Sequence, residues 1–197
     1  WVIKGGDSNP FKDVDVGKYA KPTFLTSLDV VVGNGDGNLA YFKNTGTKDY
    51  PWYTLQINIT NPFHGVNMGA YAPPAMADLD NDGDMDVVVG NQDGNLAYFK
   101  NTGNAANPVY TEQNGTDNPF DGVDVGWNAV PSMADLNDYG LVDVVVGGNG
   151  FYGGNLVYLK NTGNATNPVY TEQTGAANPF NGVNVVSNAA PATVDLD

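Results

Sequence analysis

Carboxylates occupy every second position of one short stretch of the chain: Asp78, Asp80, Asp82, Asp84 and Asp86. Like charges this close together repel one another strongly, and a bound cation would neutralise them. Calcium suits the pattern, because this hard ion takes about six to eight oxygen ligands in a flexible shell. The spacing therefore predicts a calcium site. The alternative is a solvated acidic turn between two strands.

The order of the residues assigns a role to each ligand. Alternate positions of a tightly curled loop point to one centre, so the first three acids are expected to bind by their side chains. Gly83 turns the chain at little steric cost, which lets the backbone carbonyl of Asp84 face the ion while its side chain points outward. Asp86 closes the shell. The β-branched residues after it indicate that a strand leaves the loop.

The acidic stretch lies inside a unit that the chain repeats. Three valines flanked by Asp and Gly recur at constant spacing, at residues 29–33, 86–90 and 143–147. Three further apolar runs accompany them, at residues 37–46, 94–103 and 154–163, at 52–56, 109–113 and 169–173, and at 19–26, 71–77, 128–134 and 188–194. Gly, Asn, Asp and Pro separate these runs, which predicts short strands. No stretch has a convincing helical period, so helix content should be negligible.

Four antiparallel strands per repeat are typical of a β-propeller blade. We predict an all-β, single repeat domain over residues 1–197, with full blades at about 18–57, 69–113 and 126–173. Residues 1–4 and 186–197 would add two orphan strands. Three blades and two orphans give an incomplete ring, since closure typically takes about four to eight blades. We therefore expect a part of a longer chain, or a protomer that completes its sheets with another copy; a β-solenoid is the alternative architecture.

The chain resembles the FG-GAP, or VCBS, repeat family of calcium-loaded β-propellers, whose blades also occur in integrin α-chain heads and in some lectins. Residues 69–73, 78–86 and 86–91 carry this resemblance, and it extends over nearly the whole chain. It implies that the loop joins the innermost strand of a blade to the second strand, and that calcium holds this hairpin rigid. It also implies side-chain ligation by Asp78, Asp80, Asp82 and Asp86, with Asp84 binding through its carbonyl.

The other copies of the loop depart from this pattern. The first copy is shorter and has lost the loop, so it should bind no metal. In the third copy Tyr139 stands at the place of Asp82, and three residues could still hold an ion weakly: Asp135, Asn137 and Asp143. The alternative there is a turn held by hydrogen bonds alone. The fourth copy contributes a partial loop with Asp195 and Asp197.

Several residues outside the loop are candidates for binding. Trp127 stands where the other repeats have Lys, Ala and Ser, so it could stack on a sugar ring or a partner side chain, or simply pack. Phe151 and Tyr152 lie on a hairpin insertion and form a second candidate patch. Three sequons are possible glycosylation sites in a secreted eukaryotic protein: Asn58, Asn114 and Asn164. The recurring Asn-Pro-Phe segments are interpreted as core, with Phe filling the gap between blades.

Composition limits the function. The net charge of −14 with eight Lys plus Arg argues against a nucleic-acid or anionic-membrane surface. No apolar run approaches the roughly 20 residues that span a bilayer. There are no cysteines, so no disulfide framework exists. His64 is the only histidine, and no plausible Ser-His-Asp partnership accompanies it.

The leading hypothesis is a non-catalytic, extracellular or cell-surface module, stabilised by Ca²⁺, for adhesion or for recognition of carbohydrate or protein. The alternative is a structural subunit that self-associates into fibres or oligomers through its open blade ends. A catalytic propeller ranks last. Extracellular calcium modules often bind weakly, with Kd of roughly 10⁻⁴ to 10⁻³ M, which motivates the location outside the cytosol.

Overall fold

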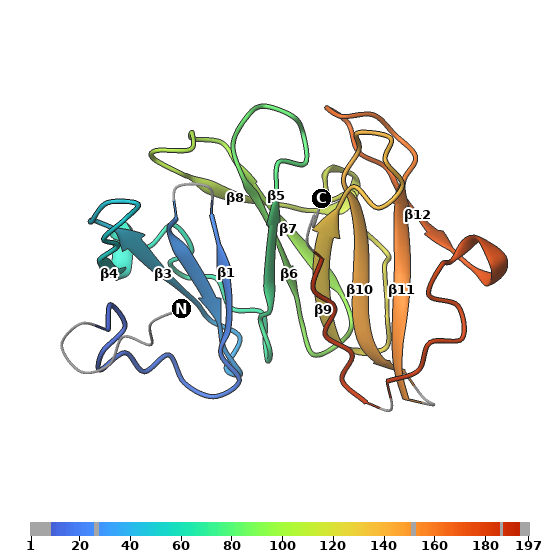
Figure 1. Ribbon diagram of the computed structural model, residues 1–197, viewed down its shortest axis with the longest axis horizontal. Coiled ribbons are helices and arrows are strands. Elements are labelled where there is room, and N and C mark those ends of the chain that lie inside the picture. The colour runs from blue at the N-terminus through green and yellow to red at the C-terminus, as the bar shows by residue number, and fades with distance from the viewer. Residues whose placement is uncertain (1–8, 26–27, 151–152, 186, 194–197) are drawn as a thin grey trace.

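The computed structural model describes residues 9–25, 28–150, 153–185 and 187–193. In this part of the chain it forms three antiparallel sheets of four strands each, side by side in chain order (Figure 1). The first sheet holds β1 (Lys21–Phe24), β2 (Val30–Gly33), β3 (Leu39–Asn44) and β4 (Tyr53–Gln56). The second holds β5 (Pro74–Ala77), β6 (Asp86–Gly90), β7 (Leu96–Asn101) and β8 (Tyr110–Gln113). The third holds β9 (Trp127–Ala134), β10 (Asp143–Gly150), β11 (Gly153–Asn161) and β12 (Tyr170–Gln173).

Helix is almost absent from the described residues, as predicted. Short 3₁₀ turns follow the fourth strand of each sheet: η2 (Asn58–Thr60), η3 (Gly115–Asp117) and η4 (Gly175–Ala177). The all-β prediction is therefore confirmed, and the three sheets form no closed ring, which is consistent with an incomplete propeller.

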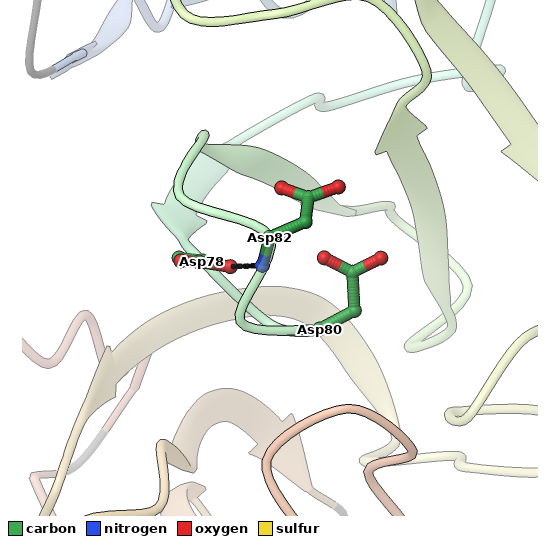
Figure 2. A group of neighbouring side chains, drawn as sticks. All are labelled: Asp78, Asp80 and Asp82. Atoms are coloured by element: carbon green, nitrogen blue, oxygen red, sulfur yellow. Dashed lines mark hydrogen bonds between the residues drawn. The ribbon is translucent and has the colours of Figure 1, made fainter.

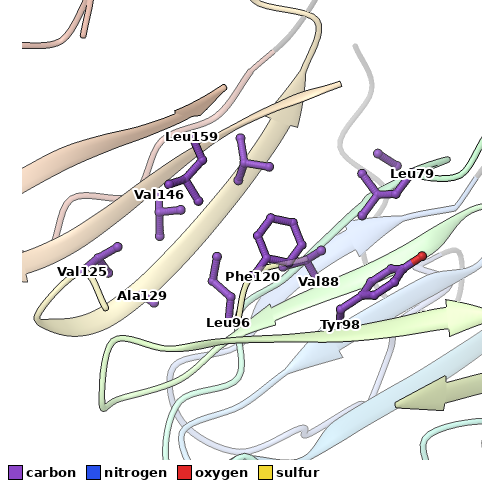
Figure 3. Close-up of a cluster of buried hydrophobic side chains, with 11 residues drawn as sticks. Leu79, Val88, Leu96, Tyr98, Phe120, Val125, Ala129, Val146 and Leu159 are labelled. Carbon is purple, nitrogen blue, oxygen red and sulfur yellow. The ribbon is translucent and has the colours of Figure 1, made fainter. Parts of the chain in front are cut away.

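The central valines of each sheet explain why the sheets stack. Because side chains alternate across a strand, Val87 and Val89 of β6 pack into one core with residues of the first sheet, while Val88 packs into another core with residues of the third. All three are fully buried. The second core includes Val146 and Phe120 (Figure 3). Apolar residues on both faces of β6 are thus explained by the sheets on both sides of it.

Two of the Asn-Pro-Phe segments, at residues 61–63 and 118–120, fill the joints between sheets, and their Phe side chains are buried as the interpretation as core predicts. Phe63 stacks on Tyr110 with ring centroids 4.6 Å apart and meets Phe99 edge-on at 6.1 Å. The amide of Asn61 donates to the carbonyl of Leu39 at 3.0 Å, and its Oδ1 accepts the backbone N–H of Phe63 at 2.9 Å. The segments that carry Phe63 and Phe120 therefore each tie one sheet to the next, whereas Phe11 and Phe180 are half-buried.

A glycine at the end of each valine run allows the next innermost strand to approach closely. A Cβ on Gly90 would lie 2.0 Å from the carbonyl oxygen of Ala129, and one on Gly147 would lie 2.1 Å from that of Ala189. Such contacts are far shorter than real ones, so no larger residue fits without movement of the backbone.

The innermost segments β1, β5, β9 and residues 190–193 surround a shallow channel of about 360 Å³. Thr193 donates its N–H to Ser132 Oγ at 3.0 Å and its hydroxyl to the Met133 carbonyl at 2.9 Å. The expected orphan strand near residues 188–194 is not a strand within the described residues 187–193, because no second strand pairs with it there. Residues 1–4, expected to be the other orphan, lie outside the described residues.

Candidate metal centre

The loop between β5 and β6 is curled by its own acidic side chains. Asp78 accepts the N–H of Asp82 on Oδ1 at 3.2 Å and the N–H of Gly83 on Oδ2 at 3.0 Å. Asp82 Oδ1 in turn accepts the N–H of Asp84 at 3.2 Å. Asn81 and Gly83 both adopt positive φ, of 57° and 95°. These are residue types that tolerate left-handed backbone, so the sequence supplies the turn where the acids need it.

This curl brings three carboxylates together. One oxygen each from Asp78, Asp80 and Asp82 lies within 4.8 Å of the other two (Figure 2). Within the described residues this is the one group of at least three acidic, His or Cys side chains that is close enough to hold a metal ion. The three acids predicted to converge do so, while Asp84 and Asp86 lie outside this group.

Two carboxylate oxygens in the loop are buried without a hydrogen-bond partner: Asp80 Oδ1 and Asp84 Oδ1. Buried carboxylate oxygens that accept nothing are costly, so a cation that they could ligate would remove a real penalty. The donors are all hard oxygens, which is the chemistry that calcium prefers. By these two criteria the residues present fit Ca²⁺.

One oxygen of the Asp84 side chain, Oδ1, is buried and has no hydrogen-bond partner. That this side chain points away from the ion stays a prediction. Burial, and then repulsion by the carboxylates of Asp82, Asp80 and Asp78, raises the pKa of Asp84.

Asp86 has a role that the sequence reasoning missed. It is fully buried and accepts the hydroxyl of Tyr98 and the N–H of Asn101, each at 2.8 Å, and the N–H of Leu79 at 3.3 Å. Burial raises its pKa to about 6, although the hydrogen bonds from Asn101 and Tyr98 oppose the shift. The carboxylate thus joins β6 to β7 and to the start of the loop.

The same arrangement recurs in the other two sheets, including the first, which has no acidic loop. Asp29 accepts the hydroxyl of Tyr41 at 2.5 Å and the N–H of Asn44 at 2.6 Å. Asp143 accepts the hydroxyl of Tyr158 at 2.7 Å and the N–H of Asn161 at 2.8 Å. The signal was present in the sequence, because the first repeat keeps this Asp after losing the loop. This carboxylate is therefore part of the blade itself, whether or not it also meets a metal ion.

Lys100 is the second residue that the sequence reasoning missed. Its ammonium forms an ion pair with Oδ2 of Asp80, whose side chain is only 10% exposed. The hydrogen bond to Asp80 is the main cause of a raised pKa of Lys100. The recurrence of lysine as Lys43, Lys100 and Lys160 is visible in the sequence, but it does not show that the second of them reaches the acidic loop.

The third loop keeps the backbone of the second with different side chains. Asp135 accepts the N–H of Tyr139 at 3.3 Å and that of Gly140 at 2.6 Å, as Asp78 does for its counterparts. The amide of Asn137 donates to Asp143, while its Oδ1 is buried without a partner. A weak ion site at Asp135, Asn137 and Asp143 stays a prediction. Asp195 and Asp197, predicted to begin a fourth loop, lie outside the described residues.

The remaining candidates are Trp127, the sequon residues and the hairpin insertion. Trp127 begins β9 and is 62% exposed. The sequon residues are all exposed at turns or strand ends: Asn58, Asn114 and Asn164. Phe151 and Tyr152 lie outside the described residues. Neither Trp127 nor any of the three sequon residues belongs to the acidic cluster.

Two equivalent grooves run along the joints between sheets. The first, of about 580 Å³, is lined by residues that include Lys43, Gln56, His64 and Pro108. The second, of about 520 Å³, includes Lys100, Gln113, Asp117 and Pro168, and one wall of it contains Asp80. The acidic loop therefore borders a groove that the repeat builds twice. Its polar lining is suited to hydrogen bonding with a small polar ligand or a peptide.

Comparison with known families agrees with the geometry. Residues 27–89 match the protein-family model described as FG-GAP-like repeat, which confirms the resemblance to the FG-GAP repeat family over that part of the chain. The matched segment contains the whole acidic loop. A search of curated proteins finds no match. Among the described residues, no helix is long and apolar enough to cross a membrane.

Proposed function

We propose that the chain is a non-catalytic module of β-propeller type, stabilised by calcium and acting outside the cytosol or at the cell surface. In this proposal each sheet is one blade, at about residues 18–57, 69–113 and 126–173, and the module recognises a carbohydrate or a protein. The match to an FG-GAP-like repeat and the three four-stranded sheets support a propeller-type module.

One observation carries the calcium proposal: the converging carboxylates of Asp78, Asp80 and Asp82, together with buried oxygens of Asp80 and Asp84 that have no partner. These residues would hold the ion, with Asp86 at the edge of the shell. Bound calcium would supply positive charge and cross-link the two ends of the loop. The loop joins β5 to β6, so calcium would stabilise one hairpin of the second sheet.

Thermal unfolding with and without calcium tests the proposal. With Kd of roughly 10⁻⁴ to 10⁻³ M, free calcium at about 10 mM is about 10 to 100 times Kd and should stabilise the fold by about 1.4–2.7 kcal/mol. For a chain of this length that corresponds to roughly 3–10 °C in Tm. Asp80→Asn should remove most of the shift. The matched control is Asp93→Asn, an exposed acid on the β6–β7 hairpin. A wild-type Tm that is the same in EDTA and in calcium would contradict the proposal.

Recognition of a partner is supported by the two joint grooves and by the exposed Trp127. A non-catalytic role is favoured because the single histidine, His64, is exposed on a turn and the clustered acids fit a metal site. A glycan array, followed by NMR titration of any sugar that binds, tests recognition. Shifts at groove residues or at Trp127 would support it, and an array with no binding would favour a protein partner instead.

Self-association is a second candidate, and the outer strand β4 favours it. This edge strand and the residues beside it expose four apolar side chains: Trp52, Leu55, Ile57 and Ile59. Leu55 stands where the equivalent strands carry Glu112 and Glu172. Charged residues on an edge strand discourage pairing with another chain, and β4 lacks them. Light scattering with Leu55→Glu tests this candidate: a loss of oligomers supports it, and a monomeric wild-type protein at high concentration contradicts it.

A further inference from the structure

Lys100 competes, in its position on β7, for the oxygens that the proposed metal centre would use. Its ammonium contacts Oδ2 of Asp80. Asp80 is one of the three acids that converge, and its other oxygen is buried without a partner. A calcium ion on the free oxygen of Asp80 would lie close to the Lys100 ammonium on the other oxygen, and the two positive charges would repel each other.

The ammonium is a poor substitute for calcium at this place. It brings a single charge and three donors, whereas the loop presents several carboxylates. With Lys100 on Asp80, the Oδ1 atoms of Asp80 and Asp84 still lack a partner. The lysine therefore relieves part of the repulsion in the loop and leaves the rest to another cation.

The other two repeats show that this contact is particular to the second sheet. Lys160, at the equivalent position, places its ammonium 5.3 Å from the ring centroid of Tyr139, which stands where the second loop has Asp82. Lys43 lies on β3, whose neighbouring hairpin has no acidic loop. The strand register thus brings a lysine to the same place in every sheet, and only Lys100 meets a cluster of carboxylates.

We propose that Lys100 is a built-in competitor for the metal centre, holding Asp80 until calcium displaces it and thereby setting the calcium concentration at which the loop fills. This proposal rests on the proposed function, since it concerns the same loop. It assigns two opposite effects to one side chain: Lys100 stabilises the loop without calcium and weakens the affinity for calcium.

Displacement would also change the second joint groove, because Lys100 and Asp80 both line it. Once it leaves Asp80, the ammonium stays tethered to β7 and remains at the groove wall. Calcium binding would then alter the charge that the groove presents to a partner.

Isothermal titration with calcium tests the proposal on the full chain. Lys100→Met keeps the apolar stem and removes the charge. This variant loses a partly exposed ion pair with Asp80 and the repulsion between neighbouring cations. We therefore expect its Kd for calcium to be about three- to tenfold lower. Tm in EDTA should fall by about 1–3 °C, so the stabilisation by calcium should grow. Lys43→Met is the matched control and should leave Kd unchanged.

Lys100→Arg keeps the charge and should change Kd in the opposite direction. It therefore tests the proposal even if Lys100→Met does not fold. A guanidinium binds a carboxylate through two parallel hydrogen bonds, so this variant should hold Asp80 more firmly and raise Kd. Asp80→Asn identifies the heat that belongs to this site.

The outcomes separate the two proposals. If the wild-type chain binds no calcium, the metal centre and the competitor are both refuted. If it binds calcium and Lys100→Met has an equal or a higher Kd, the metal centre stands and the competitor role is wrong. A lower Kd for Lys100→Met, with Lys43→Met unchanged, supports the competitor role.

Discussion

Replacing Asp29 by Ala should cost about 3 kcal/mol of unfolding free energy, although no metal site is proposed near it. Asp29 is 4% exposed and accepts two short hydrogen bonds, from the hydroxyl of Tyr41 and from the N–H of Asn44. Hydrogen bonds to a charged group contribute about 1.5–3 kcal/mol each. Part of this sum is offset because the variant no longer buries a carboxylate.

The partner variant Tyr41→Phe removes one of the two bonds and keeps the ring, so it should cost about half as much. Because both variants remove the same contact, the double variant should cost less than the sum of the two. Urea unfolding followed by both circular dichroism and fluorescence measures these differences, and agreement of the two probes checks that the repeats unfold together.

Calcium provides the control for this prediction. The hairpin before β2 lacks the acidic loop, so the loss for Asp29→Ala should be equal in EDTA and in calcium. A loss below about 1 kcal/mol, or one that appears only in calcium, would refute the reasoning that this carboxylate is a structural element of the blade.

Three further predictions use the same unfolding assay. Gly90→Ala should cost at least about 2 kcal/mol, since its Cβ would overlap the carbonyl of Ala129 and the next innermost strand would have to shift; an unchanged midpoint would refute the close approach. Phe63→Ala should cost about 3–5 kcal/mol as a buried joint residue, and Phe180→Ala clearly less because that ring is half-buried; equal losses would contradict the joint packing. Tyr98→Phe should cost about 1–2 kcal/mol through the lost hydrogen bond to Asp86, and a neutral effect would show that this bond does not stabilise the sheet.

The strands could be predicted because few arrangements of the chain satisfy their sequence pattern. Runs of three valines, apolar on both faces, predict strands that are covered on both sides, and the Gly, Asn and Pro turns between them leave only short elements. The acidic loop could be predicted for a similar reason. Alternating carboxylates around a glycine constrain the local backbone, and the three acids that start the loop do converge.

Contacts that depend on strand pairing could not be predicted in the same way. Lys100 reaches Asp80 only because β7 pairs with β6, and Asp86 reaches Tyr98 and Asn101 for the same reason. Such partners are distant in sequence, and nothing local identifies them. The sequence did show that Asp and Lys recur in every repeat, including the one without the loop. That recurrence indicates a role other than metal binding, and the metal interpretation of Asp86 obscured it.

The difference between the first and second hairpins limits what calcium can do for this fold. The first sheet has the same four strands, the same buried carboxylate and the same Asp–Tyr pair as the second, and it forms with a shorter connection in place of the loop. A four-stranded sheet of this kind therefore forms without the acidic loop and the ion that the loop would hold. Calcium in the second sheet should stabilise one hairpin and the groove wall beside it, because Asp80 belongs to both. The ion would then act on the surface that meets a partner more than on the core that holds the sheets together.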